Sequence, residues 1–209
     1  RKLIANPNAG IHFVAGGTQA NAIGISAMLK PYEAVITADT GHINVHEAGA
    51  IERCGHKVLG VQSRDGKLTC DHIESVLAVH TDEHMVSPKL VYLSNATETG
   101  TIYLKPELEK IAAFCRSNNL YLYMDGARIG CALTSAQNDL TMSEINEYLD
   151  IFYIGGTKNG ALIGEALVIN NDRFKDCFRY RIKQNGALLS KSRVFGIQFY
   201  ALLKDNLYF

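Results

Sequence analysis

The stretch Ile151-Phe152-Tyr153-Ile154-Gly155-Gly156-Thr157-Lys158-Asn159-Gly160 decides our prediction of the fold. An apolar run, residues 151–154, leads into a glycine-rich turn, and a second apolar run, Ala166-Leu167-Val168-Ile169, leads out of it. Short apolar runs bounded by glycine predict two buried strands. A lysine held between buried strands would lose hydration, which favours the neutral amine, and such an amine forms Schiff bases with aldehydes. The alternative for this stretch is a surface hairpin with a solvated lysine.

Short apolar runs alternate with helical patterns along the whole chain. This alternation predicts an α/β fold with a mostly parallel sheet flanked by helices. We expect further strands over residues 11–14, 34–38, 57–61, 90–93 and 120–124. We expect helices over residues 19–29, 46–54, 69–79, 106–118, 143–149, 173–184 and 194–203, with Ser143 as a helix cap.

Composition sets the broad class of the protein. The chain has 209 residues, 47% of them hydrophobic and 20% charged, and its formal net charge is zero. This balance is typical of a globular protein, and we expect neither nucleic acid nor a membrane as a partner. Five cysteines without a CxxC pair favour a cytoplasmic location. The chain begins at Arg1 rather than at a methionine, so we expect N-terminal residues to be missing.

The turn Gly16-Gly17-Thr18 lies between a predicted strand and a predicted helix. Glycines expose backbone N–H groups, Thr18 adds a hydroxyl, and a helix N-terminus attracts anions. The turn therefore suits a phosphate group. The alternative is an ordinary strand-to-helix turn in which Thr18 caps the helix.

Asp125 ends the predicted strand over residues 120–124, and Arg128 follows it three residues later. An ionised carboxylate at this point could hold a protonated ring nitrogen, and the guanidinium fork suits a carboxylate. The alternative is that Asp125 and Arg128 pair with each other.

Two histidines, His42 and His46, lie four residues apart after the strand over residues 34–38. They could form a metal-binding pair, but no third ligand is evident, and we expect no metal site. A flat imidazole at a strand end could instead stack on an aromatic cofactor.

The conspicuous motifs follow the carboxyl ends of predicted strands, which is where open parallel sheets bind ligands. We therefore expect the glycine-threonine turn, Asp125 and Lys158 to share one site. The motifs appear in the order Gly-Gly-Thr (16–18), Gly-His (41–42), Asp-Gly-Ala-Arg (125–128), the lysine loop (155–160) and Gly-Glu-Ala (164–166).

This ordered set resembles the pyridoxal-phosphate-dependent threonine aldolases, in the broader group of aldolases and β-eliminating lyases with the aspartate aminotransferase-like fold. The resemblance runs from about Phe13 to the end of the chain. It implies that residues 1–209 form the cofactor-binding large domain. The family also has an N-terminal segment and a small C-terminal domain, and we expect both to be incomplete in a chain that ends at Phe209.

The resemblance implies a role for each matching residue around pyridoxal phosphate. Lys158 matches the lysine that holds the cofactor covalently. Asp125 matches the aspartate that pairs with the pyridine nitrogen, and His42 matches the histidine stacked on the ring. The residues expected at the phosphate group are Gly17, Thr18 and Thr157.

Two arginines complete the set that the resemblance implies. Arg128 matches an arginine that binds the substrate carboxylate. Arg193 matches an arginine that reaches the phosphate group of the neighbouring subunit, with Lys191 as an alternative. The resemblance thus implies a homodimer or homotetramer with shared active sites.

The chain departs from the family pattern at the acid/base position. Many relatives carry a histidine near the substrate hydroxyl where this chain has Thr97, so Glu98 becomes the candidate base. His46 replaces a residue that is often aromatic and that touches the substrate. His46, or a water held by His42, is the alternative base.

The activity implied by the resemblance is cleavage of a β-hydroxy-α-amino acid, threonine or allo-threonine, to glycine and an aldehyde. One alternative is β-elimination from an amino acid with a leaving group on the same cofactor. The other is a non-catalytic fragment.

Overall fold

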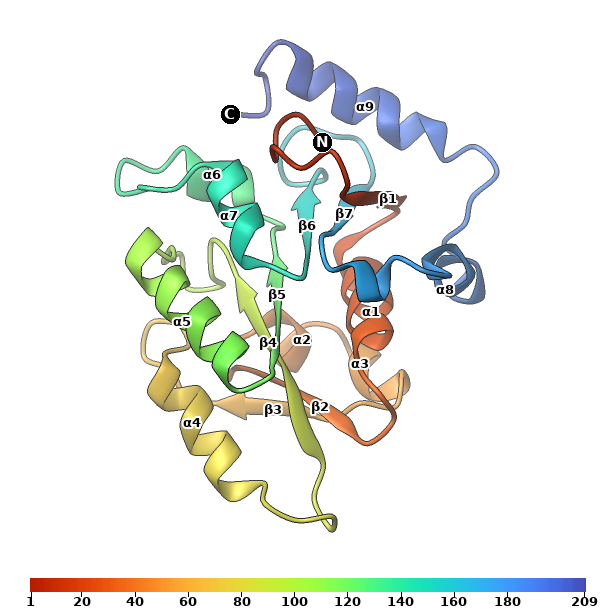
Figure 1. Cartoon of the computed structure of the whole chain (residues 1–209). Coiled ribbons are helices and arrows are strands. Elements are labelled where there is room, and N and C mark those ends of the chain that lie inside the picture. The colour runs from red at the N-terminus through yellow and green to blue at the C-terminus, as the bar shows by residue number, and fades with distance from the viewer.

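A seven-stranded sheet forms the centre of the computed structural model, which describes residues 1–209 (Figure 1). The strand order is β1-β7-β6-β5-β4-β2-β3. Only β7 runs antiparallel to its neighbours, so the predicted mostly parallel sheet is confirmed. The strands are β1 (Gly10–Val14), β2 (Glu33–Ala38), β3 (Val58–Val61), β4 (Ser87–Ser94), β5 (Tyr121–Asp125), β6 (Ile151–Gly155) and β7 (Glu165–Ile169).

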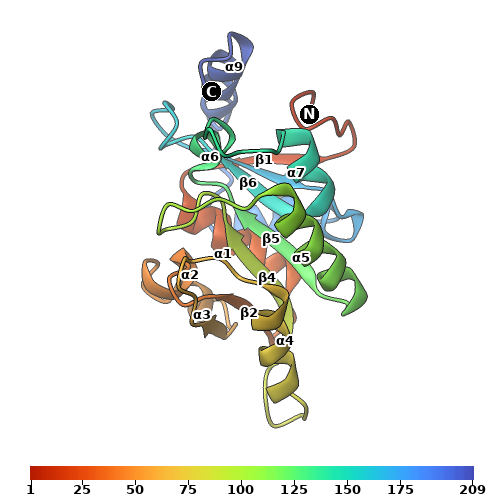
Figure 2. The ribbon, with the colours of Figure 1, turned by 90° about the vertical axis from the view of Figure 1, so that its left-hand side faces the viewer.

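Helices cover both faces of the sheet, and each face has its own hydrophobic core (Figures 1 and 2). One face carries α4 (Cys70–Val79), α5 (Lys105–Ser117), α6 (Ile129–Leu133), α7 (Met142–Tyr148) and α9 (Arg193–Lys204). The other carries α1 (Gly17–Met28), α3 (Ala50–Arg53) and α8 (Phe178–Gln184). Successive side chains of a strand point to opposite faces, so both must be apolar in a covered sheet. In β5, Leu122 and Met124 join the first core, and Tyr121 and Tyr123 the second.

The predicted helix over residues 46–54 is wrong. The chain forms two short helices instead, α2 (His42–Val45) and α3, with His42 as the first residue of α2. Ala48 and Gly49 lie between them with φ angles of 51° and 72°. This left-handed backbone is incompatible with a continuous right-handed helix, and glycine adopts it readily.

The predicted helix over residues 173–184 is also interrupted. A 3-10 turn, η1 (Asp172–Phe174), precedes α8, and Cys177 between them has a φ of 59°. The cap of α7 is Thr141 rather than Ser143, because the Thr141 side chain accepts the Glu144 N–H. The short helix α6 was not predicted.

The carboxyl ends of the six parallel strands lie at one edge of the sheet, and the amino end of β7 lies there too. The predicted motifs after β1, β2, β4, β5 and β6 therefore meet at this edge. None of the helices has the length and apolar character needed to span a lipid bilayer.

Candidate active site

A cavity of about 170 Å³ lies at this edge of the sheet. Most of the predicted site residues line it: Gly17, Thr18, His42, Glu98, Asp125, Arg128, Thr157 and Lys158. They come from segments far apart in the chain, since Gly17 begins α1 and Lys158 follows β6. The expectation that these motifs share one site is therefore met by the fold.

The start of α1 forms one end of the cavity. The helix begins at Gly17 with Gly16 as its N-cap, no side chain caps it, and no acidic residue lies in its first turn. Thr18 is therefore not the cap. A Cβ on Gly17 would come within 3.0 Å of Tyr153 Oη, so glycine keeps this wall clear. Free N–H groups and the helix dipole make this end suitable for an anion.

Asp125 is buried at the end of β5, with 5% of its surface exposed. It forms no ion pair with Arg128, because its carboxylate is engaged elsewhere. The four donors are Asn21 Nδ2 (3.0 Å), Tyr92 Oη (2.6 Å), Ala127 N (2.9 Å) and Tyr153 Oη (2.5 Å). A carboxylate offers about four lone-pair sites, so Asp125 is saturated by neutral donors.

The two tyrosines that donate to Asp125 stay protonated. Burial and the negative charge of Asp125 raise the pKa of Tyr92 and of Tyr153 well above its usual value. Each hydroxyl therefore remains a donor, and the carboxylate is the acceptor in both contacts.

A hydrogen-bonded network links Asp125 to His42. Asn21 Nδ2 donates to Asp125 Oδ2 and also to Glu47 Oε1, at 2.7 Å. His42 Nδ1 lies 2.9 Å from the same Glu47 oxygen. Tyr123 Oη donates to Asn21 Oδ1 at 3.1 Å, which fixes the orientation of the amide.

The hydrogen bond to Glu47 raises the pKa of His42, opposed by partial burial and supported by the charges of Glu47, Asp125 and Glu98. Glu47 is buried, and its Oε2 has no hydrogen-bond partner. The carboxylate thus fixes the Nδ1 proton of the imidazole that faces the cavity.

Glu98 lies on the cavity wall beside His42. Its Oε1 accepts the His42 N–H at 3.1 Å and the Ser94 hydroxyl at 2.8 Å. Thr97 lies next to it in sequence but outside the cavity wall, because its hydroxyl is bonded to Thr99 and Thr101 within its own loop.

Lys158 is exposed, so the expected loss of hydration is not found. β6 and β7 do pair as an antiparallel hairpin, the alternative that this stretch left open, but their loop also forms one wall of the cavity. Asn159 Nδ2 donates to Ala127 O at 3.0 Å and to Gly155 O at 2.9 Å. These bonds hold the backbone of the loop and leave the lysine side chain unpaired.

Besides Thr97, two predicted residues lie away from the cavity wall. Arg193 is exposed at the start of α9, and His46 is exposed after α2, with its ring centroid 5.6 Å from that of His42. The two histidines have no third ligand, and no group of three His, Cys, Asp or Glu side chains is arranged to hold a metal ion.

The sequence analysis assigned no role to Asn21, Glu47, Tyr92, Tyr153 or Glu165, all of which are buried around the site. Asn21 was detectable as a polar residue between two alanines, and Glu47 as an acidic residue directly after His46, both close to the predicted motifs. The tyrosines carried no such signal, because aromatic residues are common in buried strands.

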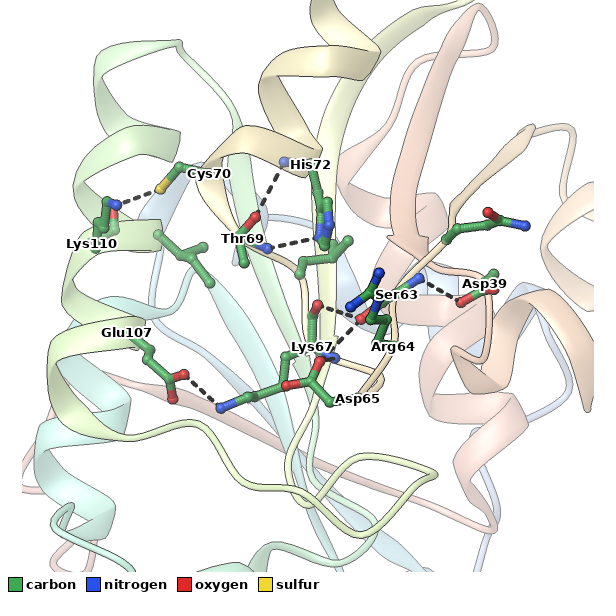
Figure 3. Close-up of a pocket in the computed structure, with 13 residues that line it drawn as sticks. Asp39, Ser63, Arg64, Asp65, Lys67, Thr69, Cys70, His72, Glu107 and Lys110 are labelled. Atoms are coloured by element: carbon green, nitrogen blue, oxygen red, sulfur yellow. Dashed lines mark hydrogen bonds and ion pairs between the residues drawn. The ribbon is translucent and has the colours of Figure 1, made fainter.

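A larger cavity of about 710 Å³ lies between α4, α5 and the turn after β3 (Figure 3). Two of its acidic side chains are engaged by other groups. Lys67 pairs with Glu107 at 2.5 Å, and Asp39 Oδ1 accepts the Ser63 N–H at 3.1 Å. None of the predicted site residues lines this cavity, so the smaller one is the candidate active site.

The sequence of this chain is similar to those of known proteins over most of its length. Residues 4–204 match the sequence profile of a family described as beta-eliminating lyase. The chain is 37% identical over 201 residues to a low specificity L-threonine aldolase of Pseudomonas sp. (strain NCIMB 10558), covering 94% of this chain and 57% of that protein. It is 32% identical to that of Escherichia coli (strain K12), covering 93% of this chain and 58% of that protein.

A solved structure described as a Leishmania major threonine aldolase is 53% identical, with a TM-score of 0.98, covering 100% of this chain and 61% of that chain. An aspartate aminotransferase from Thermus thermophilus is only 16% identical, with a TM-score of 0.72 over 95% of this chain and 50% of that chain, so it shares the fold. The chain thus spans about 57% of the length of the curated relatives that it matches.

Proposed function

Because this chain belongs to the β-eliminating lyase family, we propose that it is part of an enzyme that uses pyridoxal phosphate to cleave threonine or allo-threonine. The products are glycine and an aldehyde. We propose that residues 1–209 form the cofactor-binding large domain. One observation carries the proposal: Lys158, Asp125 and the uncapped start of α1 lie on one small cavity.

These groups fit the three functional parts of pyridoxal phosphate. The start of α1, with Gly17 and Thr18, suits the phosphate group; the buried carboxylate of Asp125 suits the pyridine nitrogen; and the unpaired amine of Lys158 suits the aldehyde. Bound in this way, the cofactor supplies an electron sink for the bond that breaks at the substrate Cα.

The saturation of Asp125 determines how it would receive a ring N–H. A fifth donor must share or displace one of the four. Tyr153 is the donor suited to give way, because its hydroxyl can rotate and the residue lines the cavity. The Ala127 N–H is fixed by the backbone.

Arg128 and Glu98 would act on the amino acid itself. Arg128 is half-buried on the cavity wall and forms no ion pair, so its guanidinium is available for the substrate carboxylate. Glu98 would take the proton of the β-hydroxyl. Its Oε1 already accepts two hydrogen bonds, and Oε2 is the oxygen without an assigned donor.

Product analysis tests the reaction class. Incubation with L-threonine and with L-allo-threonine should release glycine and acetaldehyde. Release of ammonia without glycine would identify β-elimination, which the family description favours as the second candidate. Absence of pyridoxal phosphate binding would favour a non-catalytic fragment.

We expect Glu98→Gln to keep the absorbance of bound pyridoxal phosphate and to lose at least about 10²-fold in the rate of threonine cleavage, the lower range for general-base catalysis. Glutamine keeps the shape and accepts the same hydrogen bonds, but it does not take a proton. Steady-state kinetics measures the effect. The control is Glu83→Gln, at an exposed loop residue. A near wild-type rate, together with inactivity of His46→Ala, would place the base elsewhere.

We propose that two or more copies assemble with their active sites at the boundary. The outer face of α9 exposes Val194, Ile197 and Tyr200, at 49%, 63% and 66%. Gln198 of the same helix hydrogen-bonds to Leu162 and Ile163 in the segment between β6 and β7 that also carries Lys158, so α9 packs against this segment. Arg193 begins the helix and would reach the neighbouring site, with Lys191 as the alternative.

Light scattering is expected to show a dimer or tetramer. Ile197→Asp should shift the protein toward a monomer, and the variant should lose threonine cleavage. The matched control is Val79→Asp, a residue equally exposed on α4 at 61%. An Ile197→Asp variant that remains assembled, or a fully active monomer, would contradict the proposed boundary.

The cytoplasm is the compartment that we propose. All five cysteines are free thiols, and two of them, Cys131 and Cys177, are exposed. Exposed free thiols are compatible with a reducing environment.

A further inference from the structure

Glu165 is a buried carboxyl group on the wall of the cavity. It is 2% exposed and begins β7, directly opposite Gly155 of β6. Its Oε2 accepts the Gly156 N–H at 2.6 Å, and its Oε1 accepts the Thr157 hydroxyl at 2.7 Å. No lysine, arginine or histidine pairs with it. The proposed function gives this residue no task.

The position of Glu165 conflicts with an anion at the start of α1. Glu165, Thr157, Gly17 and Thr18 all line a cavity of about 170 Å³. A carboxylate and a phosphate group in such a space repel each other, and burial intensifies the repulsion. The Thr157 hydroxyl proton also points to Glu165, so it is not available to a phosphate oxygen.

One proton on Glu165 removes both conflicts. The Gly156 N–H is a fixed donor, so Oε2 must remain the acceptor and the added proton resides on Oε1. The Oε1–H group then donates to Thr157 Oγ1. The Thr157 hydroxyl rotates and becomes free to donate into the cavity.

We propose that Glu165 is a positioning residue that takes up one proton from solvent when a phosphate monoester binds, and thereby turns the Thr157 hydroxyl toward the phosphate group. The inference rests on the proposed function, because it assumes that pyridoxal phosphate places its phosphate group at the start of α1.

The surroundings of Glu165 favour this protonation. Burial raises the pKa of Glu165, the hydrogen bonds from Thr157 and Gly156 oppose the rise, and the charge of Asp125 adds to it.

Other ionisable groups also lie near Glu165. Tyr208 lies nearby and donates to Gly155 O. β1 contributes no titratable group here, because Val14 is its partner residue. The other ionisable groups of the cavity wall are His42, Glu98, Arg128, Tyr153 and Lys158.

The sign of the pH effect follows from linkage. The phosphate group binds more tightly when Glu165 is protonated, so the pKa of Glu165 is higher in the complex than in the free protein. Affinity is therefore highest at low pH and falls as pH rises between these two pKa values, by at most about tenfold per pH unit for one proton.

Glu165→Gln mimics the protonated state. The carbonyl of the introduced glutamine must accept the Gly156 N–H, which leaves its NH₂ group to donate to Thr157 Oγ1. The probe is pyridoxine 5′-phosphate, which has no aldehyde and does not react with Lys158. Titration calorimetry from pH 6 to 9 compares wild type, Glu165→Gln and the control Glu33→Gln, a buried glutamate (7% exposed) at the far end of β2.

The ratio of the Glu165→Gln affinity to the wild-type affinity should rise with pH and reach at least about tenfold, since all shared titrations cancel in it. The ratio for Glu33→Gln should stay flat. On binding, wild type should take up as much as one proton, measured in buffers of different ionisation enthalpy, and Glu165→Gln should take up correspondingly less. The proton count on wild type stands even if the variant folds poorly.

Equal pH dependence of wild type and Glu165→Gln, with no extra proton uptake, would overturn the role of Glu165 and leave the proposed function intact. Failure of wild type to bind pyridoxine 5′-phosphate at any pH would overturn both.

Discussion

Lys158→Ala is expected to abolish covalent attachment of pyridoxal phosphate and to reduce threonine cleavage by at least about 10³-fold, the scale on which residues that form covalent intermediates act. The lysine is the amine of the cavity, and the backbone of its loop is held by Asn159 rather than by the lysine side chain. Removing an exposed side chain should change the free energy of unfolding by no more than about 0.5 kcal/mol.

Borohydride reduction of the protein with bound pyridoxal phosphate, followed by peptide mapping, measures the attachment. The label should appear on the peptide that contains Lys158 and be absent from Lys158→Ala. Lys183→Ala, an exposed residue of α8, is the control and should be labelled like wild type. Label on any other lysine would show that the assignment is wrong.

Asp125→Asn should fold and be nearly inactive. A neutral amide does not keep a pyridine nitrogen protonated, and loss of a charge-assisted contact in a dry site lowers the rate by about 10²–10³-fold. A variant with more than about half of the wild-type kcat would rule out this role. Asp139→Asn, a residue outside the cavity wall, serves as the control.

The same substitution should lower stability, because every carboxylate oxygen of Asp125 faces a donor. One oxygen accepts the Ala127 N–H and the other accepts Asn21 Nδ2. The NH₂ group of the introduced asparagine therefore faces an N–H donor in either orientation of the amide. Rotation of the Asn21 amide would turn its oxygen against Glu47. An unsatisfied buried donor costs about 1–3 kcal/mol, measurable by urea denaturation.

Local signals were sufficient for most of the sheet. Runs such as Ile151–Ile154 are apolar and short, and both faces of the sheet are covered, so most runs matched their strands to within one residue at each end. The exception is β4, which begins three residues before the predicted strand over residues 90–93. The interrupted helix before Cys54 shows the limit of such signals. Its residues have helical periodicity, but Ala48 and Gly49 adopt a left-handed backbone. The two short helices on either side have different partners, since α2 packs on β2 and β3 whereas α3 packs on α1.

The hydrogen-bond partners of Asp125 and the exposure of Lys158 could not be predicted from the sequence for a different reason. Asn21 and Tyr92 reach Asp125 from 104 and 33 positions away, so the network exists only once the sheet has formed. The exposure of Lys158 likewise depends on what surrounds its loop, not on the apolar runs that flank it.

Asn21 links two acidic side chains of the site, Glu47 and Asp125, without conducting protons between them. Its single amide nitrogen holds Glu47 and Asp125 in a fixed arrangement. A carboxamide donates hydrogen bonds without giving up its proton at neutral pH, so no proton can pass through it from one carboxylate to the other. A change in the protonation of His42 therefore reaches Asp125 only through its electrostatic field. Proton transfer elsewhere on the cavity wall therefore does not reach the Asp125 carboxylate by way of Asn21, and its negative charge is kept.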